Sequence, residues 1–457
     1  MMKKNIISVA AGSAALLMTS ASLAVSFNSF DPKSMAMGGA GVAVANPATA
    51  PLFNPALLSV ANKSDDFALE FPIFGARVFD PDDFTDAVDD FDDTVMDVLD
   101  AEISSYNGAP GASASTVNAI NAVNEEILTL SDKPFQFEGG AGIVLAIPGE
   151  KFGIAFTASG SANFSGILNY EDAETVTNLT DDMLALDACY AGPALNFENC
   201  VTSSGLSTFV DTNPASPTFG EVNFTAQSDT GGDSDIQSKV RVVGIVLAEA
   251  GLTISREMSM FGTEVAVGVT PKMVSVTVFD YEANADSADT DNIDGDDYST
   301  DYSDFNLDVG IALDHKNGWR SGFVIKNIIG QDYDAMNTDP VTGAETATDM
   351  VVSLKPQARV GVSHTNSWST VAIDVDLTEN EGLGLAGDKS QYVALGIELD
   401  AFDFAQLRFG YRADTVNSDR DVVSAGIGFS PLGIHIDIAG AFNDDEVGAS
   451  FQLGFRF

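Results

Sequence analysis

Between Glu446 and Phe457, hydrophobic and polar positions alternate without a break. Every second residue from Val447 to Phe457 is apolar, and the residues between them are small or polar. A period of two places these two sets on opposite faces of a strand. At the edge of a soluble sheet, so apolar a face would promote aggregation. A closed barrel in lipid requires it, because its outer face meets hydrocarbon and its inner face meets water.

Similar patterns mark about fourteen candidate strands along the chain. Leu307 and Val309, for example, alternate with Asp308 and Gly310. In the fifth candidate the alternation slips near Pro271, which predicts a bulge or a barrel rim. The predicted strands are Phe67–Phe79, Phe135–Ile147, Phe152–Leu168, Lys239–Glu249, Phe261–Tyr281, Phe305–His315, Trp319–Ile329, Val351–His364, Trp368–Thr378, Tyr392–Leu399, Phe402–Arg412, Val422–Phe429, Gly433–Phe442 and Val447–Phe457.

Short and long connections alternate between these strands. Short turns are expected near residues 148–150, 257–260, 316–318, 366–367, 400–401 and 431–432, and the other connections are longer and rich in acids. An outer-membrane barrel with an even number of strands has this arrangement, with short periplasmic turns and long outer loops. It places both termini in the periplasm. We expect charged side chains to face a solvated lumen and to form ion pairs, although they could also steer a substrate: Asp308, Asp314, Arg359, Asp374, Asp376, Glu398, Arg408, Arg412, His435, Asp437 and Arg456.

Residues 1–24 have the features of a secretory signal peptide. Lys3 and Lys4 precede an apolar run from Ile6 to Met18, and Ser22-Leu23-Ala24 is a small-residue cleavage site. No later apolar stretch reaches the roughly 18 residues of a membrane-spanning helix. We therefore expect an exported protein that spans the outer membrane of a Gram-negative bacterium as a barrel.

The charge of the chain excludes some functions. Lys and Arg number 21 against 67 Asp and Glu, a formal net charge of −46, so nucleic acid is not an expected partner. The three histidines are scattered and no catalytic or cofactor motif accompanies them, so the sequence predicts neither an enzyme nor a cofactor. Asn292-Ile293-Asp294-Gly295 matches only part of a calcium loop, which predicts no metal site beyond weak surface binding.

Cys189 and Cys200 are the two cysteines, and both lie in one polar segment. In an exported protein, this predicts a local disulfide that pins a long outer loop. Their spacing does not match a Cys-x-x-Cys redox motif, and two thiols alone make a poor zinc site.

The segment before the first strand is rich in small residues and X-Pro steps, including Met35–Ala45 and the motif Asn54, Pro55 and Ala56. Such a segment can pack closely inside a lumen. Residues 80–132 show helical spacing of apolar residues in two runs, which predicts a hairpin that packs on itself over the barrel mouth or acts as a ligand-capturing lid. We expect a signal peptide at 1–24, a hatch at 25–60 and a barrel at 61–457, with this insert and a long outer loop at 169–238. The predicted fold is therefore all-β: a transmembrane antiparallel barrel of about 14 strands with an N-terminal plug and an inserted helical hairpin.

The Gly/Ala-rich run followed by Asn54, Pro55 and Ala56 resembles the hatch of FadL-type outer-membrane transporters for hydrophobic compounds. A narrower branch, exported proteins named as conjugal transfer TraF, is similar in Val267–Lys272, Asn306–Gly310, Lys326–Asn327 and Lys355–Gly361. The TraF of F-type pilus assembly, which is thioredoxin-like and periplasmic, has a different pattern.

The resemblance implies passive uptake of hydrophobic or amphipathic small molecules. The alternative is a structural or surface-interaction protein of a conjugal transfer or secretion system. A cavity with apolar side chains beside the hatch would favour uptake, and a wholly polar lumen without a cavity would favour the alternative. Expected partners are outer-membrane lipid, a hydrophobic small-molecule ligand and the barrel-assembly machinery, because Phe455 and Phe457 resemble the aromatic C-terminal signature that this machinery recognises.

Overall fold

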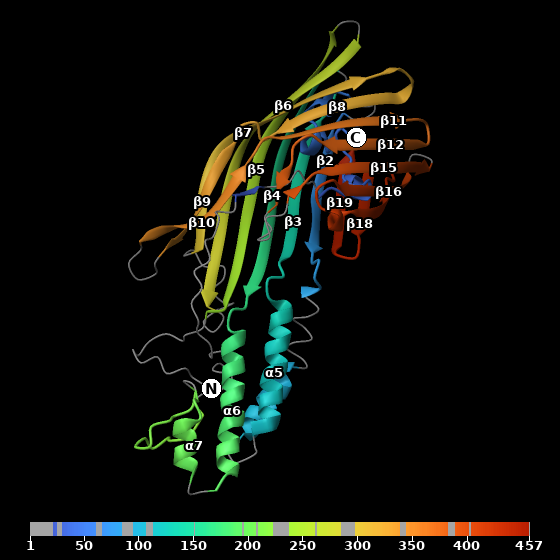
Figure 1. The fold of residues 1–457 in the computed structure, drawn as a ribbon. Coiled ribbons are helices and arrows are strands. Elements are labelled where there is room, and N and C mark those ends of the chain that lie inside the picture. The colour runs from blue at the N-terminus through green and yellow to red at the C-terminus, as the bar shows by residue number, and fades with distance from the viewer. Residues whose placement is uncertain are drawn as a thin grey trace.

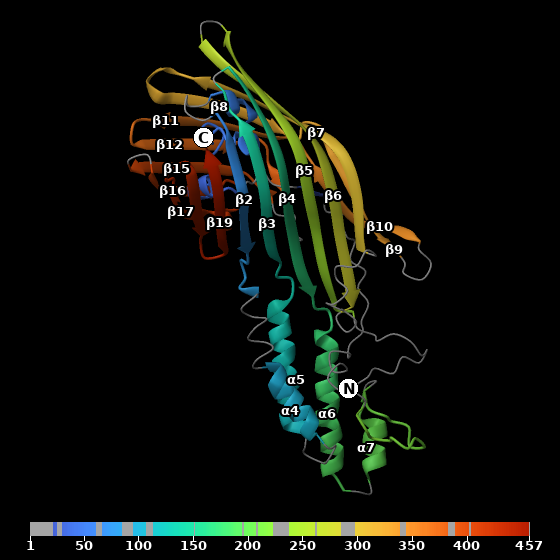
Figure 2. The ribbon, with the colours of Figure 1, turned by 180° about the vertical axis from the view of Figure 1, so that it is seen from behind.

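Fourteen antiparallel strands close into a barrel in the computed structural model (Figures 1 and 2). The structure describes residues 22–24, 30–60, 66–84, 95–106, 113–149, 151–193, 196–206, 209–222, 237–260, 263–284, 298–338, 344–382, 389–401 and 404–456. The barrel strands are β2 (Ala68–Phe79), β3 (Phe135–Ile147), β4 (Phe152–Asn169), β5 (Lys239–Met260), β6 (Thr263–Asn284), β7 (Ser299–Asp314), β8 (Trp319–Lys326), β11 (Gln357–Thr365), β12 (Ser369–Asp376), β15 (Tyr392–Ala401), β16 (Ala405–Asp414), β17 (Val422–Phe429), β18 (Ile434–Phe442) and β19 (Glu446–Arg456).

The predicted strand number and barrel fold are confirmed. Each strand pairs with its neighbours in the chain, and β19 closes the barrel against β2, from Glu446 opposite Phe79 to Arg456 opposite Ala68. The outer face is apolar: Val447, for example, is 63% exposed. The buried polar residues on the same strand, such as Gln452, face inward. This alternation matches a wall between lipid and a polar interior.

Several details of the predicted strands were wrong: β5, for example, continues to Met260 through the turn expected near 257–260. The strand expected over Val351–His364 is two elements, because Lys355-Pro356 interrupts the ladder. Strand β10 (Glu345–Leu354) belongs to a separate sheet, and β11 is part of the barrel wall. Pro271 causes no register shift: the β5–β6 ladder skips the positions beside it and resumes in the same register. The bulge lies instead in β2 between Glu70 and Ile73, on either side of Phe71-Pro72.

The N-terminal segment lies in the lumen. It contains α1 (Pro32–Ala36), α2 (Ala50–Phe53) and the 3-10 turn η1 (Pro55–Ser59). Helix α1 contacts β16 to β19, and η1 contacts β4 to β7 on the other side of the barrel. Residues 30–60, called the hatch below, therefore cross the lumen from wall to wall.

Four of the described helices project beyond the end of the barrel at which the long connections lie (Figures 1 and 2). They are α4 (Asp97–Ser105), α5 (Ser113–Leu130), α6 (Ala173–Ala191) and α7 (Phe197–Ser203). Leu99, Val117 and Ile120 from the first insert share one core with Leu179 and Met183 from the second. The expectation of a hairpin that packs on itself was therefore incomplete, because both inserts build one helical unit. Among the described helices, none is long and apolar enough to cross a membrane.

A small sheet accompanies the barrel. Strand β9 (Gln331–Thr338) pairs with β10, and β10 pairs in parallel with β1 (Ser22–Ala24). Tyr333 and Val352 of this sheet pack against inward-facing Val243 and Val276, so the β9–β10 hairpin covers the lumen side of β5 and β6. The predicted signal peptide includes β1, and its removal stays a prediction. Two further short strands, β13 (Asn380–Glu381) and β14 (Lys389–Ser390), pair with each other.

Candidate functional site: the hatch and the lumen cavity

Asn54 anchors the middle of the hatch to the wall. Its side chain is fully buried, and its Nδ2 donates to the backbone oxygens of Val42 at 3.0 Å and Ile311 at 3.1 Å. Its Oδ1 accepts from the N–H of Ala56 at 3.1 Å, which starts the turn at Pro55. One carboxamide thus connects two parts of the hatch with strand β7. Satisfying three polar groups in this way stabilises a buried turn that has no regular backbone ladder.

Wall glycines let the hatch backbone lie directly on the strands. A methyl group at Gly268 would overlap the backbone of Pro55, and one at Gly310 would overlap the Asn54 carboxamide. Gly268 and Gly310 face each other across β6 and β7. Further inward glycines contact the hatch around the barrel, and together we call these eight residues the glycine belt: Gly153, Gly268, Gly310, Gly322, Gly361, Gly396, Gly410 and Gly426.

Polar wall side chains hold the hatch from the other strands. Asp374 on β12 is buried, and its Oδ2 accepts from the N–H groups of Gly41 at 2.7 Å and Val42 at 2.8 Å. Lys33 of α1 forms an ion pair of 3.0 Å with Glu398 on β15. Charged hydrogen bonds of this kind are among the stronger ones, so the hatch is fastened to several strands.

Beside the hatch lies a cavity of about 120 Å³. Phe30 and Leu52 of the hatch line one side, and Ile73 and Leu247 contribute apolar wall. The remaining lining is polar, and much of it comes from β4, β5 and β6. The lumen is therefore not wholly polar, and its cavity combines apolar and hydrogen-bonding surfaces.

The charged groups around the cavity form ion pairs or bond to the hatch backbone. The ammonium of Lys272 lies 2.8 Å from Glu249 and 3.0 Å from Asp308. Asp308 also accepts from the N–H of Asn327 at 2.8 Å. The ammonium of Lys326 donates to the Leu52 carbonyl of the hatch at 3.2 Å. Buried pairs of this kind resist separation, because a lone charge in the lumen wall would be poorly solvated.

A groove on the outer face lies behind the same part of the wall. Its lining includes the exposed side chains of Phe71, Phe74 and Met273. Groove and cavity share small residues of β3 and β4 such as Gly142 and Gly160. Only a thin wall with few large side chains therefore separates the cavity from the lipid-facing surface, next to the bulge in β2.

Other lumenal charges predicted from sequence also form ion pairs, among them Arg412 with Glu446 at 2.7 Å and Arg456 with Glu70 at 3.2 Å. Arg408 bridges Glu398 at 2.6 Å and also contacts Asp437, and Arg359 pairs with Asp376. These side chains are buried inside the barrel, as expected of inward positions. Asp314, which pairs with Arg320, is exposed near the end of β7, so it lies outside the buried lumen.

The three histidines lie apart. His435 is buried at 2.5 Å from Glu70, His315 contacts the Ser321 hydroxyl at 2.9 Å, and the ring of His364 packs on Trp319. Among the described residues, no group of three or more His, Cys, Asp or Glu has the arrangement of a metal site. The calcium-like stretch 292–295 lies outside the described residues.

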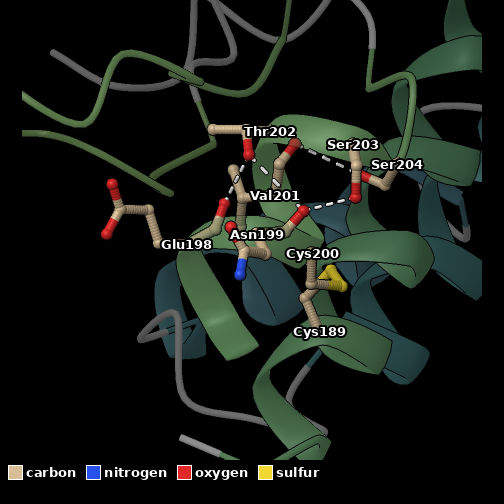
Figure 3. The surroundings of a disulfide bond; sticks show 8 residues. All are labelled: Cys189, Glu198, Asn199, Cys200, Val201, Thr202, Ser203 and Ser204. Atoms are coloured by element: carbon tan, nitrogen blue, oxygen red, sulfur yellow. Dashed lines mark hydrogen bonds between the residues drawn. A yellow bond between two sulfur atoms is a disulfide. The ribbon is translucent and has the colours of Figure 1, made fainter. Parts of the chain in front are cut away.

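Cys189 and Cys200 form a disulfide between α6 and α7, with Cα atoms 5.6 Å apart (Figure 3). Cys189 is buried in a small core with Leu186 and Val201. In α7, the Thr202 hydroxyl donates to the Glu198 carbonyl at 2.7 Å (Figure 3). The bond therefore fastens a short helix, which has little stability of its own, to a longer one.

Of the C-terminal aromatic residues, Phe455 lies on β19 opposite Ile434 and Leu69. Phe457 lies outside the described residues. Their expected role as an assembly signal stays a prediction. Sequence reasoning did not identify the cavity, because Phe30, Leu52, Lys272 and Lys326 are brought together only by the hatch and the wall. The stretches around Gly268, Gly310 and Gly361 carry the family resemblance, but their sequence alone does not indicate contact with the hatch.

This fold, with its lumen-filling hatch, defines the chain as a plugged transmembrane β-barrel. The chain belongs to the family described as "F plasmid transfer operon, TraF, protein", whose model matches residues 51–376. The predicted TraF branch is therefore confirmed.

Several solved structures are similar to the chain at low identity. The toluene transporter TbuX of Ralstonia pickettii is 12% identical, with 94% of this chain and 98% of that chain covered and a TM-score of 0.45. The toluene transporter TodX of P. putida is 10% identical, with coverages of 94% and 99% and a TM-score of 0.46. A FadL homologue of Pseudomonas aeruginosa is 11% identical, with coverages of 93% and 98% and a TM-score of 0.46. No curated protein matches the sequence.

Proposed function

We propose that this protein is an outer-membrane channel through which hydrophobic or amphipathic small molecules pass passively. The observation that carries the proposal is the cavity between the hatch and strands β2 to β7, with Phe30, Leu52 and Leu247 in its lining. Most ligand sites are concave, with apolar walls and a few oriented polar groups. The chain's own features thus favour uptake over a purely structural role.

The hatch gives the proposed channel its selectivity. A barrel of this size without a plug would let small polar solutes pass, whereas here the hatch is seated on the glycine belt and fastened by Asp374. Compounds that fit the cavity would reach the thin wall shared with the outer groove. An apolar compound could then enter the membrane directly, because the groove faces lipid.

A flux assay in proteoliposomes tests this function. We would measure uptake of toluene and benzyl alcohol by the wild type and by Ser161→Phe, whose larger side chain would fill the cavity from β4. We expect faster uptake than in protein-free vesicles and a severalfold loss in Ser161→Phe. Gly440→Ala is the control for a wall substitution away from the cavity, because a methyl group there would meet only the Gly448 carbonyl oxygen at 3.7 Å. Equal uptake with and without protein would refute the proposal.

A surface-interaction role in conjugation is the second candidate. It is favoured by the family description, which names a plasmid transfer operon, and by the helical unit with its own core of Leu99, Val117 and Met183. Mating frequency would be measured in a plasmid-bearing host with and without the gene, and with a variant lacking residues 97–130. A frequency that depends on the helical unit while flux stays normal would favour this role.

A further inference from the structure

The polar part of the cavity consists of hydroxyl groups as well as paired charges. On β4, the inward positions Thr157, Ser159, Ser161 and Asn163 line the cavity in sequence. Thr157 donates to the Gly251 carbonyl at 3.4 Å, so its hydroxyl is used within the wall. Within the part of the chain that the structure describes, the hydroxyls of Ser159 and Ser161 have no hydrogen-bond partner.

A charged ligand would have to compete with internal ion pairs. The ammonium of Lys272 already has two carboxylates within 3.0 Å, those of Glu249 and Asp308. The third acid of the lining, Glu138, pairs with Arg77 at 3.1 Å. A ligand carboxylate could approach Lys272 only by displacing an acid, and a ligand ammonium could approach these acids only by displacing a cation. Either exchange leaves a displaced charge in the lumen wall.

We infer that the cavity selects neutral amphiphiles: an apolar body carrying one hydroxyl or similar uncharged polar group. The apolar body would lie against Phe30, Leu52 and Ile73, and the polar group would bond to Ser159 and Ser161. A hydroxyl can both donate and accept, which suits two free serine hydroxyls. This inference rests on the proposed function, because it names the class of molecule that the same cavity takes.

Four probes that share one aromatic ring distinguish a preference for neutral amphiphiles from a preference for apolar, anionic or cationic ligands. Binding of benzyl alcohol, toluene, benzoate and benzylamine would be measured by calorimetry with the folded protein in lipid nanodiscs. Ser161→Phe, with its filled cavity, gives the background from partitioning into lipid. We expect the affinity for benzyl alcohol to exceed that for benzoate and benzylamine at least tenfold. Equal or tighter binding of either ion would overturn the inference.

Serine variants identify the polar contact. The double variant Ser159→Ala/Ser161→Ala should weaken the binding of benzyl alcohol about threefold to tenfold, the usual effect of losing a neutral hydrogen bond. Its affinity for toluene should stay unchanged. Ser165→Ala is the matched control, because Ser165 is buried on the same strand and does not line the cavity. An unchanged alcohol affinity in the double variant, or an equal loss in the control, would overturn the assignment. Binding needs no transport, so a failed flux assay would refute uptake without deciding ligand preference.

Discussion

Asn54 of the hatch and Gly310 of strand β7 fit each other so closely that a single methyl group at position 310 would overlap the Asn54 carboxamide. The same carboxamide donates to the backbone oxygen of Ile311, the next residue on that strand. Two adjacent wall positions therefore fix the place of the hatch: Ile311 accepts a hydrogen bond from it, and Gly310 leaves room for it because it has no side chain. This relationship makes the plug testable by very small changes.

Gly310→Ala should loosen the hatch. The added methyl group cannot be accommodated unless Asn54 moves, and overpacking of this kind costs about 1–3 kcal/mol. We expect single-channel conductance in planar bilayers to rise severalfold, with heat-modifiable gel migration unchanged because the barrel ladder is intact. Gly440→Ala, at an open glycine on the lipid-facing side of β18, should conduct like the wild type. Equal conductance in all three proteins would mean that the hatch does not limit conduction.

Substitutions of Asn54 should loosen the hatch to different degrees. Asn54→Ala removes the donor to Val42 and Ile311 and leaves the buried Val42 carbonyl without this partner, at a cost on the order of 1–3 kcal/mol. Asn54→Asp keeps the shape but directs a carboxylate oxygen at two carbonyls, so it should loosen the hatch more. Conductance should therefore increase from wild type to Ala to Asp. Asn417→Ala is the control, because Asn417 caps η7 (Ser418–Arg420) outside the hatch. An Asn54→Asp variant with the conductance of the wild type would contradict the prediction.

The Cys189–Cys200 bond should stabilise the helical unit and leave the barrel unaffected. The cysteines are 11 residues apart, and closing so short a loop is worth about 2–3 kcal/mol. Cys189→Ser/Cys200→Ser should speed proteolytic cleavage near α7 and leave heat-modifiable migration unchanged. Thiol labelling of the denatured, unreduced wild type should be negative. Two labelled thiols would show that the bond does not form in the cell.

Acid should loosen the loop after α7. Hydrogen bonds from the Ser216 hydroxyl, the Asn213 N–H and the Thr218 hydroxyl lower the pKa of Asp211 below its usual 3.8. A lowered folded-state pKa contributes stability above the unfolded value, and this contribution is lost as the pH falls through the folded value. The protection factors of the amides at residues 211–221, which correct the exchange rate for its intrinsic pH dependence, should therefore fall below about pH 4. Asp211→Asn should lower these protection factors already at pH 7 and remove the step near pH 4; a persistent step in the variant would assign it to another group.

The strands could be predicted from the sequence because their signal is local. Alternation such as that of Leu307 to Gly310 indicates, within a few residues, which face of the strand contacts lipid and which faces the lumen. Strand ends depend on partners, so the boundary between β10 and β11 was missed although Pro356 marks it. The second pair of helices, α6 and α7, was expected only as a loop, because Leu179 and Met183 of α6 find their core against the first insert, which is far away in the sequence.

The cavity could not be predicted for a different reason. Phe30 and Lys272 are far apart in the chain, and only the path of the hatch through the closed barrel brings them to one space. The free hydroxyls of Ser159 and Ser161 carry no motif, and serine is common on inward barrel positions. The motif Asn54, Pro55 and Ala56 was recognisable, but what it contacts depends on glycines two hundred and more residues later.

The glycine belt reverses the usual relation between side-chain size and tolerance to change. In most cores a large buried residue is the one that cannot be exchanged, because removing it leaves a void. Here the residues without side chains are the restricted ones, since Gly268, Gly310 and Gly410 each have hatch atoms where a methyl group would lie. In a library of all single substitutions, the large lipid-facing residues would tolerate most apolar replacements. The strictest positions would be those at which the smallest possible residue is already present.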